Sequence, residues 1–170
     1  MTKIIVPAKT FSPFPPLHAL FFSCLLLGAS SVAHAEIPAP YPGTQTVSSQ
    51  HSFDKLLQRL ERAISDNKMG LVAQASASKG AAARGVKIPG NAVLMVFRND
   101  YAVRMLEASL PSGIEAPLRL YVTENTNGTG SITYRTPSAT FAPYRSAKLD
   151  ALARELDPVL AKIVTNAAGK

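Results

Sequence analysis

Two stretches of alternating residues, joined by a polar turn, restrict the fold of this chain more than any other feature. The first, PLRLYVTE (117–124), places its aliphatic side chains on one face and Arg119 on the other. The second, GSITYRT (130–136), carries Ile132 and Tyr134 with the same period of two. The segment between them, NTNGTG, contains the Asn-Gly pair that is typical of tight hairpin turns. The pattern therefore predicts an antiparallel hairpin with one face toward the core, and Arg119 pointing away from it.

Helical periodicity appears on both sides of this hairpin. The clearest helix follows Ser52, which suits an N-cap, and its apolar residues are Phe53, Leu56, Leu57, Leu60 and Ile64. A long amphipathic helix is expected over about 146–166, kinked or split at Asp157-Pro158. Shorter helices are expected over 78–84 and over 100–110, the second with one face formed by Ala102, Met105, Leu106 and Ser109.

Three further strands complete the predicted order of elements. They are expected over residues 44–50, 70–76 and 91–99, where β-branched and aliphatic residues gather. The predicted order is strand, helix, strand, short helix, strand, short helix, hairpin and long helix. This order is typical of the α+β class. We therefore expect one domain, residues 44–170, with helices packed on one face of a mainly antiparallel sheet. The uncovered face is the natural place for a ligand or a dimer contact.

The N-terminus has the parts of a secretory signal. Lys3 and Lys9 precede an apolar run over 17–27, and the small-residue site Ala33-His34-Ala35 follows. An uncleaved anchor is not expected, because the run is short and small residues follow it. A lipoprotein is not expected either, because Cys24 follows Phe21-Phe22-Ser23 inside the apolar run, where a lipidation site needs a run of small residues. We expect a signal peptide over residues 1–35, cleaved after Ala35, which would send the protein to the periplasm or the medium. A Pro-rich lead-in, residues 36–43, would follow.

Cleavage would remove the only cysteine, Cys24, so no disulfide is expected in the folded domain. It would also leave 16 of the 18 Lys and Arg residues against 11 acidic ones, a net charge of +5. The basic residues are scattered rather than clustered, which is typical of a solvated surface. We therefore expect neither a nucleic-acid partner nor insertion into a membrane after cleavage.

Three segments resemble a bacterial family, DUF302, whose function is unknown: SFDKLLQRLERAISDNKMGLVAQ, GVKIPGNAVLMVFRN and MLEASLPSGIEAPLRLYVTENTNGTGSITYRTP. The resemblance covers roughly residues 47–145. It implies a TBP-like fold, with one strand and a helix followed by four strands and a helix, and often a homodimer. It implies no established reaction. Family members often carry an Asp-His pair where this chain has Ser76-Ala77, and Gly-Asn-Pro where it has Arg98-Asn99-Asp100, so a function that needs that histidine is not expected here.

Catalytic and metal-binding patterns are poorly represented. His51 would be the only histidine after cleavage, so no metal and no other cofactor is expected. TENTNGTGSITY lacks the carboxylates of a calcium loop, and GAAARG lacks the Lys-Ser or Lys-Thr of a phosphate loop. No Gly-x-Ser-x-Gly element is present. These patterns favour a protein without catalytic activity.

Arginine and tyrosine side chains are the remaining candidates for a functional role. The candidate ligand-binding residues are Arg98, Asn99, Arg119 and Tyr134, with Arg104, Tyr121 and Arg135 nearby in the predicted order. Guanidinium groups suit carboxylate or phosphate, so these residues predict a groove for an anion. The alternative is that they are solvated strand-face and packing residues. We expect an exported, non-enzymatic module for a small ligand or protein partner on the open sheet face; the alternative is a periplasmic enzyme that uses Arg, Tyr and a carboxylate.

Overall fold

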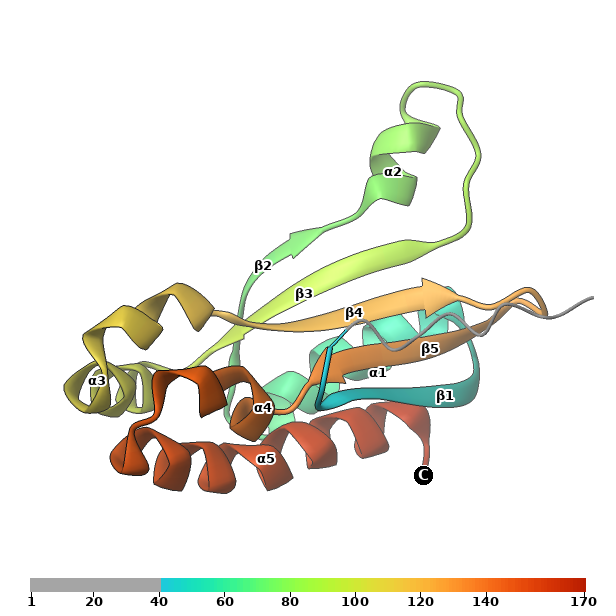
Figure 1. Ribbon diagram of the computed structural model, residues 1–170. Coiled ribbons are helices and arrows are strands. Elements are labelled where there is room, and N and C mark those ends of the chain that lie inside the picture. Colours follow the sequence, from blue (N-terminus) through green and yellow to red (C-terminus); the bar gives the residue numbers. More distant parts are fainter. Residues whose placement is uncertain (1–40) are drawn as a thin grey trace, which may run out of the picture. The chain divides into compact units, whose positions relative to one another are not determined.

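The computed structural model describes residues 41–170. The predicted signal peptide and most of the Pro-rich lead-in lie outside the described residues. Within residues 41–170 the chain forms one five-stranded antiparallel sheet with the strand order β1-β5-β4-β3-β2 (Figure 1). The strands are β1 (Thr44–Ser52), β2 (Gly70–Ala75), β3 (Asn91–Phe97), β4 (Leu118–Glu124) and β5 (Thr129–Arg135).

Two long helices, α1 and α5, pack on one face of this sheet (Figure 1). The helices of the described residues are α1 (Phe53–Asp66), α2 (Ala77–Ala82), α3 (Asn99–Ala108), α4 (Pro137–Phe141) and α5 (Ala147–Ala168), with short 3-10 turns η1 (Leu110–Glu115) and η2 (Ala142–Tyr144). The predicted α+β class, with helices on one face of an antiparallel sheet, is confirmed. None of the helices within residues 41–170 is long and apolar enough to cross a membrane.

Local signals explain where α1 begins and which face it buries. The Ser52 side chain accepts a hydrogen bond from the backbone N–H of Lys55, which satisfies a donor that the first helical turn leaves free. Leu56, Leu60 and Ile64 follow at helical spacing and are almost completely buried. They pack against the inner side of the sheet, where Leu94, Leu120, Val122 and Ile132 come from β3, β4 and β5. This is the larger of two apolar clusters, and it fixes which side of each strand faces inward.

The smaller cluster lies where α3, α4 and α5 meet beyond the end of the sheet. Its buried residues are Met105, Phe141, Leu149, Leu152, Ala153 and Leu156. Here the predicted inner face of α3 needs a correction, because Leu106 is 41% exposed whereas its neighbour Met105 is buried. A short helix such as α3 buries only one narrow face, here the face with Met105. Leu106 lies on the adjacent face, which is exposed to solvent.

The long C-terminal helix is continuous through Pro158, so of its two predicted forms, kinked or split, the split is wrong. The helix α5 is assigned as one element from Ala147 to Ala168 with Pro158 inside it, so it is not split. Leu156 and Leu160, on either side of the proline, are both buried. Packing therefore holds the helix together across the position where proline removes a backbone hydrogen bond.

The hairpin register positions the polar residues of β4 and β5. Leu120 pairs with Tyr134, and Val122 pairs with Ile132. These four side chains are buried on the helix-covered face. Their neighbours therefore lie on the other face, which we call the open face. There Arg119 and Tyr121 are exposed, and the described helices leave this part of the sheet largely uncovered.

Candidate functional site

The structure does not bring the four predicted ligand-binding residues together. Arg119 lies on the open face of β4, as expected. Tyr134 lies on the opposite face, where it is only 8% exposed and belongs to the main apolar cluster. Arg98 and Asn99 lie beyond the end of β3, where α3 begins. A single groove formed by Arg98, Arg119 and Tyr134 is therefore wrong, because the sheet separates Arg119 from Tyr134.

Arg98 already has a partner for its charge. Its Nε and Nη2 atoms donate hydrogen bonds to the two carboxylate oxygens of Asp100, at 2.7 and 2.9 Å. These bonds raise the pKa of Arg98 and lower the pKa of Asp100. The guanidinium group also stacks on the Tyr101 ring, 3.8 Å from the ring centre. Arg98 thus stabilises the start of α3, and the exposed Asn99 is simply its first residue.

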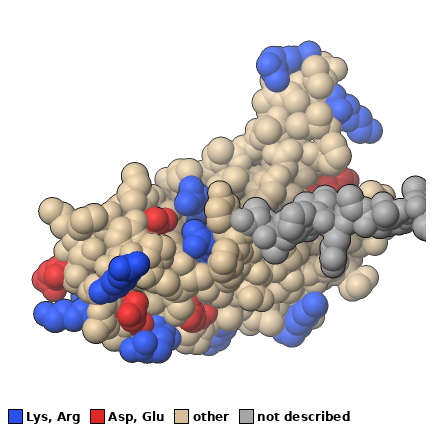
Figure 2. Space-filling view, in the orientation of Figure 1, with Lys and Arg blue, Asp and Glu red and all other residues tan. Residues whose placement is uncertain are grey.

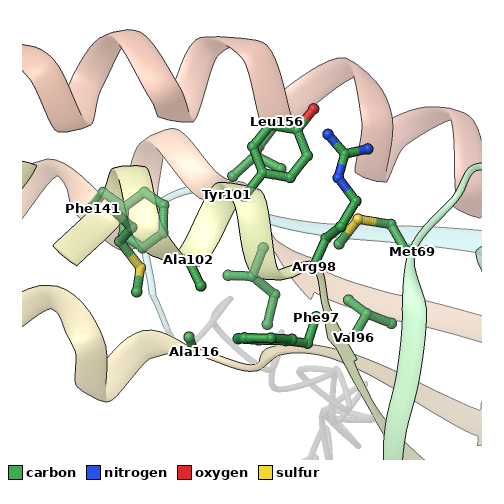
Figure 3. Close-up of a pocket in the computed structure, with 11 residues that line it drawn as sticks. Met69, Val96, Phe97, Arg98, Tyr101, Ala102, Ala116, Phe141 and Leu156 are labelled. Atoms are coloured by element: carbon green, nitrogen blue, oxygen red, sulfur yellow. The ribbon is translucent and has the colours of Figure 1, made fainter. Parts of the chain in front are cut away.

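A small apolar cavity lies beside Arg98 (Figure 3). Figure 3 shows Arg98 extending next to Tyr101, with Met69 on the other side of Arg98 and Phe141 on the side of Tyr101 that is away from Arg98. The lining also includes Met105 and Leu156, so the cavity joins the two apolar clusters. Its volume is about 30 Å³, which is room for one or two water molecules. This cavity is a gap in the packing and is too small for an organic ligand.

A second hollow lies on the open face. It has the arginine-rich lining that the sequence analysis predicted for an anion-binding groove, but different residues form it. It is lined by Arg119, Arg135, Leu118, Glu115 and Thr140 and has a volume of about 70 Å³. The pair Leu120–Tyr134 places the next residues outward, Arg119 and Arg135, side by side on the open face. Glu115 comes from η1 and Thr140 from α4, and these two elements close one end of the hollow.

Arg135 is held by the fold but is not fully satisfied. Its Nη2 atom donates to the carbonyl oxygen of Ala139 at 3.0 Å, and its guanidinium lies 5.5 Å from the centre of the Tyr41 ring. Its Nε atom is buried and has no hydrogen-bond partner among residues 41–170. The same is true of the Thr44 hydroxyl, and Thr44 faces Arg135 across the β1–β5 ladder. Unpartnered buried polar atoms are rare in folded proteins, and two in one cross-strand pair indicate a place that a ligand or water completes.

The charge at this hollow is positive. The ion pairs within the described part of the chain are Arg98–Asp100 and Arg104–Glu155, and neither involves Arg119 or Arg135. Glu115 is the acidic residue of the lining, and it accepts a hydrogen bond from the Tyr144 hydroxyl at 2.9 Å. Burial, followed by this bond to Glu115, raises the pKa of Tyr144. One carboxylate thus faces two guanidinium groups, and it is already engaged by a neutral donor.

These residues are suited to holding an anion. Two guanidinium groups offer planar sets of N–H donors that match the oxygens of a carboxylate or a phosphate. Among residues 41–170, no group of His, Cys, Asp or Glu side chains is arranged to hold a metal ion. The sequence predicted Tyr134 as a ligand-binding residue of β5, whereas in the structure Arg135 is the residue of β5 that lines the hollow. The alternation of Ile132 and Tyr134 contained the signal, since it places Arg135 on the same face as Arg119.

Comparisons with known proteins agree with this fold. A crystal structure of an uncharacterized conserved DUF302 protein from Bacillus stearothermophilus superposes with a TM-score of 0.67 at 22% sequence identity. The match covers 74% of this chain and 98% of that one, and at this identity it shows the fold alone. A search of curated proteins finds no match. The sequence matches the family described as domain of unknown function DUF302 over residues 45–167. The chain belongs to this family.

Proposed function

We propose that this protein is an exported binding module that holds a carboxylate or phosphate group between Arg119 and Arg135 on the open face of its sheet. The observation that supports this most directly is the buried, unpartnered Nε of Arg135 beside the Arg119 guanidinium, which has no ion-pair partner among residues 41–170. An anionic oxygen in the hollow would accept hydrogen bonds from both groups. Each such charge-assisted bond contributes roughly 1.5–3 kcal/mol.

The surroundings of the hollow favour binding over catalysis. A general acid or base must be free to exchange a proton with a substrate, whereas Glu115 is hydrogen-bonded to Tyr144. The surface next to Arg119 is partly apolar, because Met95 pairs with Arg119 across the sheet and Tyr121 is 42% exposed. We therefore propose a ligand with an acidic group for the hollow and an apolar or flat portion that lies along β3 and β4.

A titration followed by NMR tests the site. We expect inorganic phosphate or glutarate to shift the backbone amide signals of residues near Arg119, Arg135 and Thr140. Replacing Arg119→Ala or Arg135→Ala should weaken the affinity by about tenfold or more, because each removes a charge-assisted contact. The matched control is Arg154→Ala, which removes the same charge from an exposed position on α5.

The outcome of this titration separates a built site from general attraction. Equal weakening by Arg154→Ala would mean that net charge alone attracts the anion. Shifts centred on Arg98 and Asn99 would place the ligand at the start of α3 and contradict the proposal.

The proposed export is supported by the predicted signal peptide, residues 1–35. The charged start, the apolar run 17–27 and the Ala33-His34-Ala35 site support cleavage after Ala35. Sequencing the N-terminus of the protein purified from its own cells should give Glu36 as the first residue. A chain that starts at Met1 in the cytoplasm would overturn the proposed location without affecting the anion site.

A further inference from the structure

The segment between β2 and β3, residues 76–90, projects beyond the sheet and carries α2 near its end (Figure 1). We call this segment the arm. Ala81 is buried within it, while the residues from Ala82 to Pro89 are all exposed. Figure 2 shows Lys and Arg atoms at the far end of this projection and no acidic atoms there on the visible face. The arm is therefore a projecting, basic element. Its last residues, Lys87 to Pro89, also line a hollow of about 410 Å³ with Glu124 and the β4–β5 turn.

The arm combines basic and apolar side chains at its end. Lys79, Arg84 and Lys87 are all exposed. Val86 and Ile88, on either side of Lys87, are 50% and 40% exposed. The sequence contains no Asp or Glu from residue 67 to residue 99, so no acidic residue within the arm neutralises these charges. Exposed aliphatic residues among uncompensated positive charges have no evident use in folding.

Contacts at the base of the arm hold it without using these side chains. The Ser76 hydroxyl accepts a hydrogen bond from the Lys79 backbone N–H and caps α2. Ser78 and Asn91 form two bonds between the arm and β3, through the Ser78 hydroxyl and the Asn91 backbone. The Glu124 carboxylate accepts from the Gly90 N–H at 2.7 Å. The end of the arm is thus presented by a fixed base, and its side chains are free to contact a partner.

We propose that the end of the arm docks on the surface of an anionic phospholipid bilayer. Lys79, Arg84 and Lys87 would meet lipid phosphates, while Val86 and Ile88 would lie between headgroups. A bilayer is favoured over an acidic protein because the arm projects beyond the sheet, and because its aliphatic residues are interspersed with the basic ones as at a lipid interface. This proposal does not depend on the Arg119–Arg135 hollow, which lies on another part of the domain.

Vesicle binding tests the proposal with an intrinsic reporter. The chain has no tryptophan, so Val86→Trp introduces a single indole at the end of the arm. The protein from residue 36 onward is used, because both apolar clusters lie within the described residues 41–170 and the apolar run 17–27 would itself bind lipid. We expect the Trp emission to shift to the blue with vesicles of phosphatidylcholine and phosphatidylglycerol, and to stay unchanged with phosphatidylcholine alone.

Charge variants show whether the arm itself makes the contact. Each basic residue near an anionic surface contributes about a fivefold gain in partitioning, so Arg84→Ser with Lys87→Ser should weaken vesicle binding by about 25-fold. The matched control is Lys148→Ser with Lys162→Ser, which removes the same charge from exposed positions on α5 and should have a much smaller effect. Thermal melting of both variants verifies that they are folded.

Three results would overturn the proposal. Equal loss of binding in the two charge variants would show attraction by net charge rather than by the arm. An absence of binding to the mixed vesicles would exclude the bilayer. A blue shift with polyglutamate but not with vesicles would assign the arm to an acidic protein partner instead.

Discussion

At the scale of single residues, neighbours decide what each arginine does. Arg104 is exposed on α3, and its two terminal nitrogens donate to both carboxylate oxygens of Glu155 at 2.8 and 2.7 Å. This pair raises the pKa of Arg104 and lowers the pKa of Glu155, as the Arg98–Asp100 pair does for its own groups. Within the described residues 41–170, Arg119 and Arg135 have no such acid. Arg104 therefore links α3 to α5, whereas Arg119 and Arg135 keep hydrogen-bond donors that a ligand can use.

Tyr134 and Arg119 should respond in opposite ways to removal of their side chains. Tyr134→Ala should destabilise the domain by roughly 3 kcal/mol or more, because it opens a cavity in the main apolar cluster. Arg119→Ala should change the free energy of unfolding by less than about 0.5 kcal/mol, since Arg119 is exposed and unpaired within residues 41–170. Urea denaturation measures both. A large loss of stability in Arg119→Ala would show that Arg119 has a structural role.

At the scale of elements, the approach of α1 to the sheet depends on a residue without a side chain. A Cβ atom added to Gly130 on β5 would lie 2.7 Å from Leu56 Cδ2 and 3.5 Å from the Phe53 backbone. Gly90, before β3, is similarly close to the Phe53 ring. The first turn of α1 therefore rests directly on the strands, and this contact helps to set the height of the helix layer above the sheet.

Gly130→Ala should accordingly destabilise the domain. We expect a loss of about 1–3 kcal/mol, as for other overpacked core positions, because Leu56 or the first turn of α1 must shift. The matched control is Gly80→Ala in α2, where the added Cβ meets no atom within 4 Å and alanine favours the helix by up to about 1 kcal/mol. Denaturant unfolding of both variants measures the difference. A neutral Gly130→Ala would mean that α1 moves away from the sheet without loss.

At the scale of the whole domain, one exposed apolar patch is not explained by folding. Val103 and Leu106 on α3 and Leu110 and Ile114 on η1 are all exposed, with Leu110 at 75% and Ile114 at 82%. Leu106 lies close to η1, since a Cβ on Gly113 would be 2.9 Å from it. Exposed aliphatic residues gathered in this way are typical of protein interfaces. Ile114 is next to Glu115, which lines the Arg119–Arg135 hollow, so a homodimer formed here would border that hollow.

We therefore predict that the protein forms a homodimer and that its interface is made by α3 and η1. Leu110→Ser with Ile114→Ser should shift the protein to a monomer in sedimentation velocity experiments, because a two-fold interface loses both side chains on each copy. Val86→Ser with Ile88→Ser replaces two exposed aliphatic residues of the arm and should leave the dimer unchanged. A wild-type protein that stays monomeric at all concentrations would exclude this interface.

The sequence by itself determined the kind and order of the five strands and of α1, α2, α3 and α5, because hydrophobic periodicity, the Ser52 cap and the Asn-Gly turn act over a few neighbouring residues. It did not predict the short helix α4. It also determined that Arg119 faces away from the core, since alternation along a strand is local. Only the tertiary structure decided which polar groups meet. Arg119 and Arg135 are joined by the β4–β5 register, and Glu115 and Thr140 reach them because η1 and α4 pack at the end of the sheet. Contacts between residues far apart in the chain depend on that packing, which no local pattern specifies.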